Sequence, residues 1–472
     1  MPKFKFALFL PVLLWMTAGS FNVSGQNASS DLTGFQRSAY DIFKELVEIN
    51  TTHSKGSTKA AEAMYERLLA AGFSDGDVKI VGPGPEHMNL VVRYRGTGKL
   101  KPILFIGHLD VVEALRRDWT VDPFSFGEAD GYFYGRGTTD MKEDDAVLIA
   151  CLIRLRQERF VPDRDIIVAL TEGEEGGDAN GVNWLLVNRR DLINAEYCVN
   201  PDGGGGNIKN GKPGVMNIQT SEKVYVDLKF ETHYNGGHSS LPGNDNAIYE
   251  LCRALDKLSG YDFPIRLNET SRLFFERNAL NETGRLQSDM IAAGRIPPDT
   301  SAAERLARSS PYYNSMMRTT CVATLLDGGH ANNALPQTAE ANINCRLLPD
   351  DNPENVLSTL KSVINDPQVG ITISEASIIS PVSPLRNDVL AVLDSITASM
   401  WPGVIVTPLM SAGATDGRYL RKAGIAVYGI SGMFKDVDDV RAHGRDERIG
   451  SKEFYKGLEF MYRFIRALSG IS

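Results

Sequence analysis

The feature that most constrains the fold is an ordered series of metal-binding residue types, each placed just after a strand-like stretch or in a glycine-rich loop. The apolar run Ile103 to Ile106 ends in Gly107-His108-Leu109-Asp110, and further carboxylates and a second imidazole follow along the chain. In open α/β sheets, ligands collect at the carboxyl ends of the strands. The pattern therefore predicts one oxygen- and imidazole-rich metal site at the edge of a sheet. The series comprises His108, Asp110, Asp140, Glu174, Glu175, Asp202 and His443.

The periodicity of the chain predicts an α/β fold with two domains. At 472 residues the chain exceeds the roughly 250 to 300 residues that one hydrophobic core usually supports. Helical spacing at Ser38 to Leu46 and Lys59 to Ala71 alternates with β-rich runs such as Asn89 to Tyr94 and Ile166 to Leu170. This alternation predicts a mostly parallel open sheet with helices on its faces.

A smaller unit is expected to interrupt this domain, dividing it into residues 26–221 and 381–472. Within residues 222–380 the order β-α-β-β-α-β is that of a ferredoxin-like sandwich. Residues 261–318 enlarge this lid with helical, charge-rich segments, and a disordered linker is the alternative. The expected elements are strands at Val224 to Thr232, Thr319 to Leu326, Glu340 to Leu348 and Ile371 to Glu375, and helices at Ala247 to Leu258 and Glu354 to Ile364.

The first 25 residues are expected to be a secretory signal peptide. Two lysines precede the apolar run Phe6 to Met16, and small and polar residues follow it. Cleavage is expected after Val23-Ser24-Gly25, with Ala18-Gly19-Ser20 as the alternative site. The mature protein would then be periplasmic or secreted, without stable membrane insertion, whereas a retained anchor is the alternative.

The charge and the cysteine content exclude several classes of protein. The formal net charge is -9 and no basic cluster is present, which argues against a nucleic-acid partner. The 5 cysteines are too few and too scattered for a disulfide framework or a zinc finger. Cys321 and Cys345 fall in consecutive strand-like segments and could pair across them, which the sequence leaves open.

Each member of the series also has an ordinary structural explanation. Asp140 lies in a glycine-rich turn before a helix, where it could hold a metal or simply cap the helix. Glu174 and Glu175 could form a solvated turn, but beside a metal one can coordinate while the other accepts a proton from water. Asp202 precedes a polyglycine loop and His443 lies among charged residues, so a flexible loop and an exposed histidine are the alternatives.

As an ordered set, these motifs resemble the dinuclear zinc hydrolase family that includes glutamate carboxypeptidase, aminoacylase, succinyl-diaminopimelate desuccinylase and carboxypeptidase S. The resemblance covers nearly the whole mature chain and is strongest to the carboxypeptidase S and N-acyl-amino-acid hydrolase branch. It implies that the inserted unit is a lid and dimerisation domain. It also implies a small peptide or N-acyl amino acid as substrate and allows a homodimer through the lid.

The resemblance further implies a ligand set for two zinc ions. Asp140 would bridge both ions, His108 and Asp202 would complete one site, and Glu175 and His443 the other. Cobalt or manganese can occupy similar sites. The peptide bond after Asp140 is expected to be cis.

Catalytic roles follow from the same resemblance. A dizinc-bound hydroxide would attack the carbonyl, with Glu174 as the general base that later protonates the leaving amine. Asp110 would orient His108. One departure from the family is Glu143-Asp144-Asp145, where small residues are common. These acids are expected to cap the first turn of a helix, or to add negative charge near the metals.

The inserted unit and the last third of the chain contain substrate-binding motifs by resemblance. His238, in Gly236-Gly237-His238, would stabilise the oxyanion, often in the active site of the partner subunit. Asn333 resembles the lid asparagine, and Arg346 the lid arginine that pairs with a substrate carboxylate. Glycine turns, a capped helix and a surface arginine are the structural alternatives. The loop expected to close around the substrate carboxylate contains Gly413, Thr415, Asp416 and Arg418.

The sequence therefore predicts a metal-dependent hydrolase of a C-terminal peptide bond or an N-acyl-amino acid amide bond. An aminopeptidase with a related dizinc core is one alternative, which the inserted lid with His238 and Asn333 disfavours. A non-catalytic ligand-binding protein of the same fold is the other. That alternative predicts a missing ligand or a replaced Glu174, and neither is seen.

Overall fold

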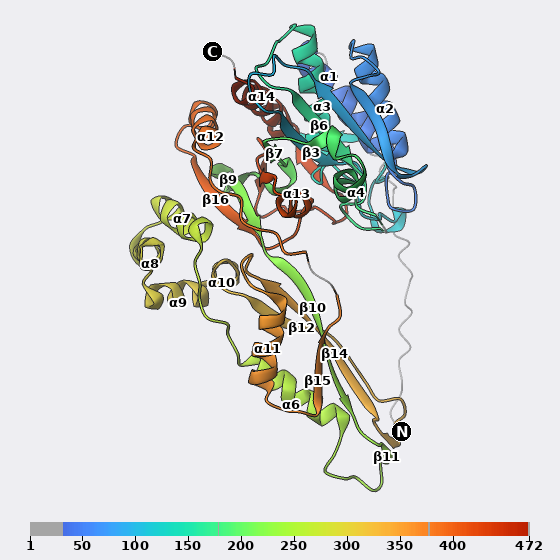
Figure 1. The fold of residues 1–472 in the computed structure, drawn as a ribbon, viewed down its shortest axis with the longest axis vertical. Helices are drawn as coiled ribbons and strands as arrows, with labels where there is room; N and C mark the ends of the chain where they lie inside the picture. Colours follow the sequence, from blue (N-terminus) through green and yellow to red (C-terminus); the bar gives the residue numbers. More distant parts are fainter. Residues whose placement is uncertain (1–31, 178, 376–377, 471–472) are drawn as a thin grey trace, which may run out of the picture.

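The computed structural model describes residues 32–177, 179–375 and 378–470, which form two bodies (Figure 1). The first body is built around a six-stranded sheet, and the second, elongated body around a four-stranded sheet. The predicted signal peptide lies outside the described residues. Within the described ranges, no helix is long and apolar enough to cross a membrane.

The sheet of the first body has the strand order β1-β2-β6-β3-β7-β17. Neighbouring strands from β6 to β17 are parallel, whereas β2 is antiparallel to both β6 and β1. Every residue of β3 and β6 is buried, as expected for central strands covered on both faces. The strands are β1 (Val78–Gly84), β2 (His87–Tyr94), β3 (Ile103–His108), β6 (Ile166–Thr171), β7 (Tyr197–Val199) and β17 (Ala426–Tyr428).

Helices cover both faces of this sheet because successive strand residues point to opposite sides. Phe105 packs into the core beneath α1, α2, α3 and α14, whereas Leu104 and Ile106 face α4, α5 and α13. A capping box between Thr33 and Gln36 begins α1. The helices are α1 (Gly34–Glu48), α2 (Thr58–Ala70), α3 (Lys142–Gln157), α4 (Gly181–Asn188), α5 (Arg190–Ile193), α13 (Gly417–Lys422) and α14 (Ser451–Leu468).

Two smaller sheets complete the first body. One has the order β16-β9-β8-β18 and is flanked by α12 (Asn387–Met400), and the other has the order β19-β5-β4. Only Lys223 separates β9 from β10, the first strand of the second body. The strands are β8 (Gly205–Lys209), β9 (Lys212–Glu222), β16 (Ile405–Ser411), β18 (Phe434–Asp436), β4 (Gly127–Ala129), β5 (Tyr132–Tyr134) and β19 (Arg448–Gly450).

The second body is an antiparallel sheet of order β12-β14-β10-β15 with α6 and α11 packed on it. Burial alternates along β10 and β14, so one face of the sheet forms the core with these helices. Cys321 and Cys345 lie opposite each other in β12 and β14 and form a disulfide. The elements are β10 (Val224–His233), α6 (Ala247–Ser259), β12 (Thr320–Gly328), β14 (Thr338–Leu347), α11 (Pro353–Ile364) and β15 (Val369–Ile373).

Residues 261–318 fold into four short helices rather than a linker. Their own core contains Phe275 and Met290 and extends to Leu348 after β14 and Met410 in β16. Figure 1 shows this helical group beside β9 and β16, so the segment predicted to extend the lid also braces the first body. The helices are α7 (Glu269–Asn278), α8 (Gly284–Gly294), α9 (Thr300–Ser309) and α10 (Pro311–Met317).

Candidate metal centre

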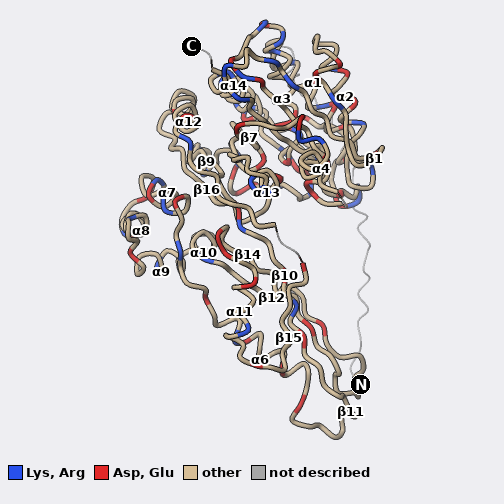
Figure 2. Tube along the Cα trace, in the orientation of Figure 1, with Lys and Arg blue, Asp and Glu red and all other residues tan. Residues whose placement is uncertain are grey.

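Three neighbouring parallel strands deliver acidic and imidazole side chains to one edge of the main sheet. β3 ends at His108, Glu174 lies three residues after the end of β6, and Asp202 lies three residues after the end of β7. Asp140 comes just before α3, and its peptide bond to Met141 is cis, as the family resemblance implied. Figure 2 shows acidic residues meeting in this part of the first body, between β7, α13 and α4.

Asp140 lies between two imidazoles. Its Oδ1 is 3.2 Å from His108 Nε2, and its Oδ2 is 3.0 Å from His443 Nε2. His443 Nε2 is also 2.9 Å from Glu175 Oε1. Ligand atoms lie within 4.8 Å of one another in three overlapping groups: His108 with Glu174 and Glu175, His108 with Asp140 and Asp202, and Asp140 with Glu175 and His443. One carboxylate with an imidazole on each oxygen is the arrangement that a bridging ligand requires.

Asp110 connects His108 to the acidic loop. Its carboxylate accepts hydrogen bonds from Glu174 N at 3.2 Å and from Glu175 N at 2.9 Å. Its backbone oxygen is 3.0 Å from His108 Nδ1, which leaves Nε2 of that ring facing Asp140. The ring orientation and the position of both glutamates therefore depend on one buried residue.

The electrostatics of the centre fit a divalent cation. Burial, together with the charges of Asp202 and other nearby acids, raises the pKa of Glu174 to about 9. Burial and the charge of Asp140 raise the pKa of Asp202 to about 7. The pKa of His108 is raised well above its usual value by Asp140, Asp110 and Glu174, although burial acts in the opposite direction. This excess of buried negative charge would be offset by metal ions, and carboxylate with imidazole is a zinc donor set.

A buried ion pair supports the turn before Asp140 and was not singled out in the sequence. Arg136 Nη1 donates to Glu447 Oε2 at 2.6 Å, and their side chains are 3% and 0% exposed. Glu447 Oε1 accepts from Thr139 N at 2.7 Å and from Thr139 Oγ1 at 3.1 Å. Since Glu447 follows His443 by four residues, this pair joins the segments that hold two of the predicted ligands.

The three acids that follow the turn lie in the first turn of α3, as expected, and all of them are buried. Glu143, Asp144 and Asp145 are 0%, 2% and 0% exposed. Lys435 Nζ lies 3.2 Å from Glu143 Oε1, and the Ser431 hydroxyl donates to Asp144. Burial raises the pKa of Glu143 well above its usual value and that of Asp144 to about 6.

Three of the predicted substrate-binding residues line one cavity of about 520 Å³ where the two bodies join. Arg346 and Arg418 bring two guanidinium groups to it, and Gly413 contributes backbone. Arg346 lies over the Tyr225 ring at 4.6 Å and donates to the Ala412 carbonyl at 3.3 Å. Planar cations of this kind suit a carboxylate.

Thr415 and Asp416 are buried behind this cavity. Thr415 N donates to Glu222 Oε2 at 2.5 Å. Asp416 accepts from Asn180 Nδ2 at 2.5 Å and from Thr171 Oγ1 at 3.2 Å, and burial raises its pKa to about 6. Asp416 thus ties the cavity loop to the end of β6, next to the acidic loop.

His238 and Asn333 lie far from the metal centre within this chain. His238 is in β11 (Gly237–His238), which pairs with β13 (Ala334–Leu335), the strand that directly follows Asn333. Figure 1 shows β11 at the end of the second body that points away from the first. β10 runs from the joint towards this tip, and ten residues at about 3.3 Å each span roughly 30 Å. The structure therefore does not bring His238 to His108 in one chain.

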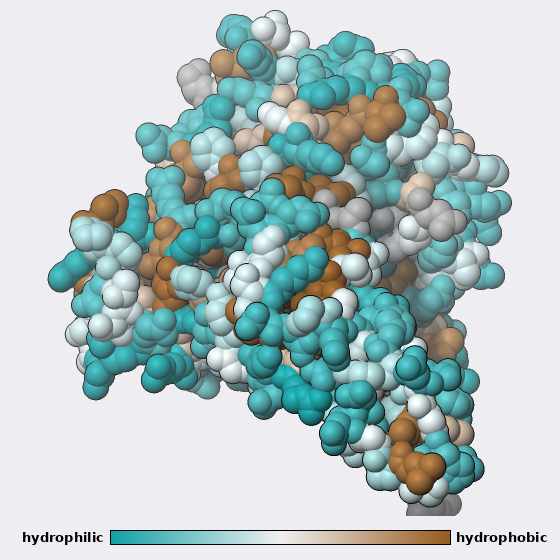
Figure 3. Space-filling view, turned by 60° about the horizontal axis from the view of Figure 1, so that its bottom comes forward, coloured by the Kyte–Doolittle hydropathy of each residue, from teal (hydrophilic) through white to brown (hydrophobic). Residues whose placement is uncertain are grey.

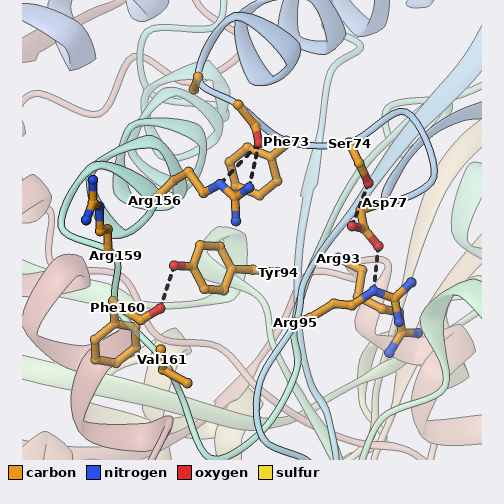
Figure 4. A pocket seen from close by; sticks show the side chains of 12 residues that line it. Phe73, Ser74, Asp77, Arg93, Tyr94, Arg95, Arg156, Arg159, Phe160 and Val161 are labelled. Carbon is orange, nitrogen blue, oxygen red and sulfur yellow. Dashed lines mark hydrogen bonds and ion pairs between the residues drawn. The ribbon is translucent and has the colours of Figure 1, made fainter.

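A further cavity of about 610 Å³ lies at the opposite edge of the main sheet (Figure 4). It is lined by Tyr94 at the end of β2 and by Arg156 near the end of α3, whose first turn is at the metal centre. None of its lining residues belongs to the predicted metal series. The converging ligands, rather than this cavity, mark the candidate active site.

Comparisons with known proteins agree with this assignment. Residues 104–467 match the sequence model of Peptidase family M20/M25/M40. Probable carboxypeptidase S-like 2 of Dictyostelium discoideum is 30% identical over 391 residues, covering 80% of this chain and 74% of that protein. The N-fatty-acyl-amino acid synthase/hydrolase PM20D1 of Homo sapiens is 28% identical over 427 residues, covering 88% of this chain and 83% of that protein.

Solved structures share the mixed α/β fold with several sheets. The M20 family metallo-carboxypeptidase Sso-CP2 from Sulfolobus solfataricus superposes with a TM-score of 0.68 at 18% identity. The superposition covers 93% of this chain and 100% of that one. It therefore spans both bodies described above.

Proposed function

The chain belongs to peptidase family M20/M25/M40 and is an enzyme of the carboxypeptidase and aminoacylase type, and on that premise we propose that it hydrolyses a C-terminal peptide bond or an N-acyl-amino acid amide bond. The observation that carries the proposal is Asp140 between His108 and His443, with one imidazole on each oxygen. Glu175 and Asp202 complete the two halves of this group. We assign these five residues to two metal ions, with zinc as the first choice.

The chemistry divides between the ions and the protein. Two zinc ions would polarise the scissile carbonyl and lower the pKa of a water molecule. Glu174 takes the proton of the attacking water and returns it to the leaving amine. Burial raises the pKa of Glu174, which makes its carboxylate a stronger proton acceptor. Asp110 holds the Glu174 backbone and the His108 ring, so the base and the ligand keep a fixed relation.

The substrate carboxylate is proposed to bind in the cavity between the bodies. Arg346 and Arg418 supply the positive charge there, and the loop that contains Arg418 reaches the metal centre through Asp416. Relatives named for carboxypeptidase and N-fatty-acyl-amino acid hydrolase activity point to substrates with a free carboxylate beside the scissile bond. A free carboxylate next to the cleaved amide is common to both substrate classes.

We infer that the second body is a ferredoxin-like lid that completes the site through a homodimer. Its element order and the strand order β12-β14-β10-β15 support the ferredoxin-like description. β12 is an edge strand with Val322, Leu325 and Leu326 exposed by 60%, 70% and 65%. Figure 3, in which the tip of the second body comes forward, shows hydrophobic side chains gathered there. An exposed apolar edge strand such as β12 is a surface on which a second copy of the chain can pair. In such a dimer, the tip of the partner could bring its His238 to this metal centre.

The decisive experiment compares Glu174→Gln with wild type on N-acyl amino acids, dipeptides and amino-acid amides. Removing the base should lower kcat by at least about 10² to 10⁴-fold while the bound metal is unchanged. Glu62→Gln, an exposed change in α2, is the matched control and should leave kcat unaltered. Near-normal turnover in Glu174→Gln would refute the assignment. Preference for amino-acid amides would favour an aminopeptidase, and binding without turnover in wild type a non-catalytic protein.

Sharing of His238 between subunits is tested with mixed dimers. His238→Ala and Glu174→Gln should each be inactive, and their mixture should regain part of the wild-type rate because one complete site can form across the dimer. A mixture as inactive as its components would contradict this arrangement. The domain boundaries and export through residues 1–25 remain proposals, which limited proteolysis and N-terminal sequencing of the mature protein would test.

A further inference from the structure

A second group of metal-binding side chains lies outside the centre around Asp140 and consists of His53, His87 and Glu172. His53 follows α1, His87 is the first residue of β2, and Glu172 directly follows β6. β2 and β6 are antiparallel, with Leu90 opposite Leu170. The start of β2 and the end of β6 therefore meet at the same edge of the sheet, where the turn that contains His53 also lies.

The three side chains are close enough to share an ion. One ligand atom from each lies within 4.8 Å of the other two. His87 Nδ1 is 2.6 Å from Glu172 Oε1, and the His53 and His87 rings stack with centroids 5.6 Å apart. In a tetrahedral zinc site with bonds of about 2.1 Å, ligand atoms are about 3.4 Å apart. An ion would replace the direct contact between His87 and Glu172, so these two groups would move apart by about 0.8 Å while the exposed His53 ring turns towards them.

Glu172 points to a ligand that the described protein atoms do not supply. It is 2% exposed, and its Oε2 has no hydrogen-bond partner in the described part of the chain. A buried carboxylate oxygen is normally paired with a donor, a water molecule or a cation. The backbone fixes the group in place, because Glu172 N donates to Asn89 Oδ1 at 3.0 Å and Glu172 O accepts from Gly181 N at 2.7 Å.

We propose that His53, His87 and Glu172 bind a third divalent transition-metal ion, separate from the pair at Asp140. Two imidazoles and one carboxylate form a zinc donor set with an open fourth position, and Fe²⁺ also accepts this set. His53 is exposed and His87 half-buried, so an ion can enter from solvent. The proposal rests on these three residues and does not require the proposed hydrolytic function.

The third ion would fix the loop that presents the base. Glu172 is the residue before Gly173, at the start of the segment that contains Glu174 and Glu175. At the other end of this segment, a Cβ added to Gly177 would lie 2.6 Å from His53 Nδ1, so backbone and ring are in close contact. An ion held by Glu172 and His53 would therefore restrain both ends of the acidic loop.

Metal content measured by mass spectrometry after zinc saturation and removal of free zinc tests the proposal. Wild type should hold about three equivalents per chain, against about two in His53→Ala, His87→Ala and Glu172→Gln. His330→Ala, an exposed histidine in the second body, is the matched control and should hold as much zinc as wild type. A parallel anaerobic series with Fe²⁺ identifies which ion the site prefers. Equal zinc content in wild type and in the His53, His87 and Glu172 variants would overturn the proposal.

A variant that lacks the predicted bridging ligand of the main centre tests whether the third site is separate from it. Asp140→Ala removes the predicted bridging ligand of the main centre, so about one zinc should remain, bound at the third site. This zinc should disappear when Asp140→Ala is combined with His53→Ala. Zinc should also raise the Tm of Asp140→Ala but not of the double variant. Loss of all zinc in Asp140→Ala alone would refute a separate third site. Loss of turnover with retained third-site zinc would bear only on the hydrolase proposal.

Discussion

Replacing Glu447 by glutamine should expose the cost of leaving a buried guanidinium without its counter-charge. Glu447 and Arg136 are almost fully buried and 2.6 Å apart. Burial raises the pKa of Glu447 even though Arg136 lies beside it, which indicates that pairing only partly offsets desolvation. The main loss in Glu447→Gln therefore comes from the uncompensated charge of Arg136. The amide oxygen can still accept from Thr139, so the substitution isolates this effect.

The expected loss in the free energy of unfolding is about 3 kcal/mol. Breaking a buried ion pair by removing one partner costs about 3 to 5 kcal/mol. The Arg136 guanidinium also lies over the Trp119 ring at 5.0 Å, a contact that survives the substitution and favours the lower end of that range. Glu459→Gln is the matched control, because Glu459 and Arg463 are 41% and 46% exposed, and it should cost less than about 1 kcal/mol.

Urea unfolding followed by tryptophan fluorescence measures this difference. Within the described ranges, Trp119, Trp184 and Trp401 all lie in the first body, so the signal reports the body that contains the ion pair. Arg136→Met combined with Glu447→Gln should recover part of the loss, because no unpaired charge remains. Equal midpoints for Glu447→Gln and Glu459→Gln, or no recovery in the double variant, would refute the reasoning.

Two further predictions concern pH and substrate binding. Burial raises the pKa of Asp144 from 3.8 to about 6, so the folded state binds this proton more tightly than the unfolded state does. The free energy of unfolding is therefore highest below pH 3.8 and falls as the pH rises to about 6. Metal-free protein should lose stability over this interval, and Asp144→Asn should remove part of that slope in Tm measured against pH; an unchanged slope would contradict it. Arg346→Ala should raise KM for carboxylate substrates about 10 to 100-fold, and Arg346→Lys should restore only part of the affinity because a lysine lacks the bidentate fork. Equal KM values for all three proteins would exclude Arg346 from carboxylate binding.

The strands that position the metal centre were predictable because each one is a continuous run of apolar residues. The runs Ile103 to Ile106 and Ile166 to Leu170 are uninterrupted apolar stretches, and both form fully buried strands. A polar side chain directly after such a strand emerges at the sheet edge, which is where His108 lies. The order of motifs along the chain then placed Asp140 and His443 with it by resemblance.

Long-range burial was not predictable in the same way. Glu143, Asp144 and Asp145 look like helix-capping acids, and their burial depends on Lys435 and Ser431, nearly three hundred residues further along the chain. Local periodicity cannot show which distant side chain covers a helix terminus.

The group of His53, His87 and Glu172 was missed for a related reason. Its members have no shared motif and meet only because β2 runs antiparallel beside β6. The strand order of a sheet is a tertiary property, so a sequence scan for spaced ligands does not find such a set.

Because β9 continues almost directly into β10, a small rotation where they join would move the far end of the second body by a larger distance. Lys223 is the single residue between these strands, and its buried ammonium donates to the Arg318 carbonyl, which holds the joint against the helical segment. At the end of a strand that spans roughly 30 Å, a change of about 10° at Lys223 would move the tip with His238 by about 5 Å. Because Lys223 also lines the cavity with Arg346 and Arg418, a substitution there would alter both the joint that positions the tip and the proposed carboxylate site.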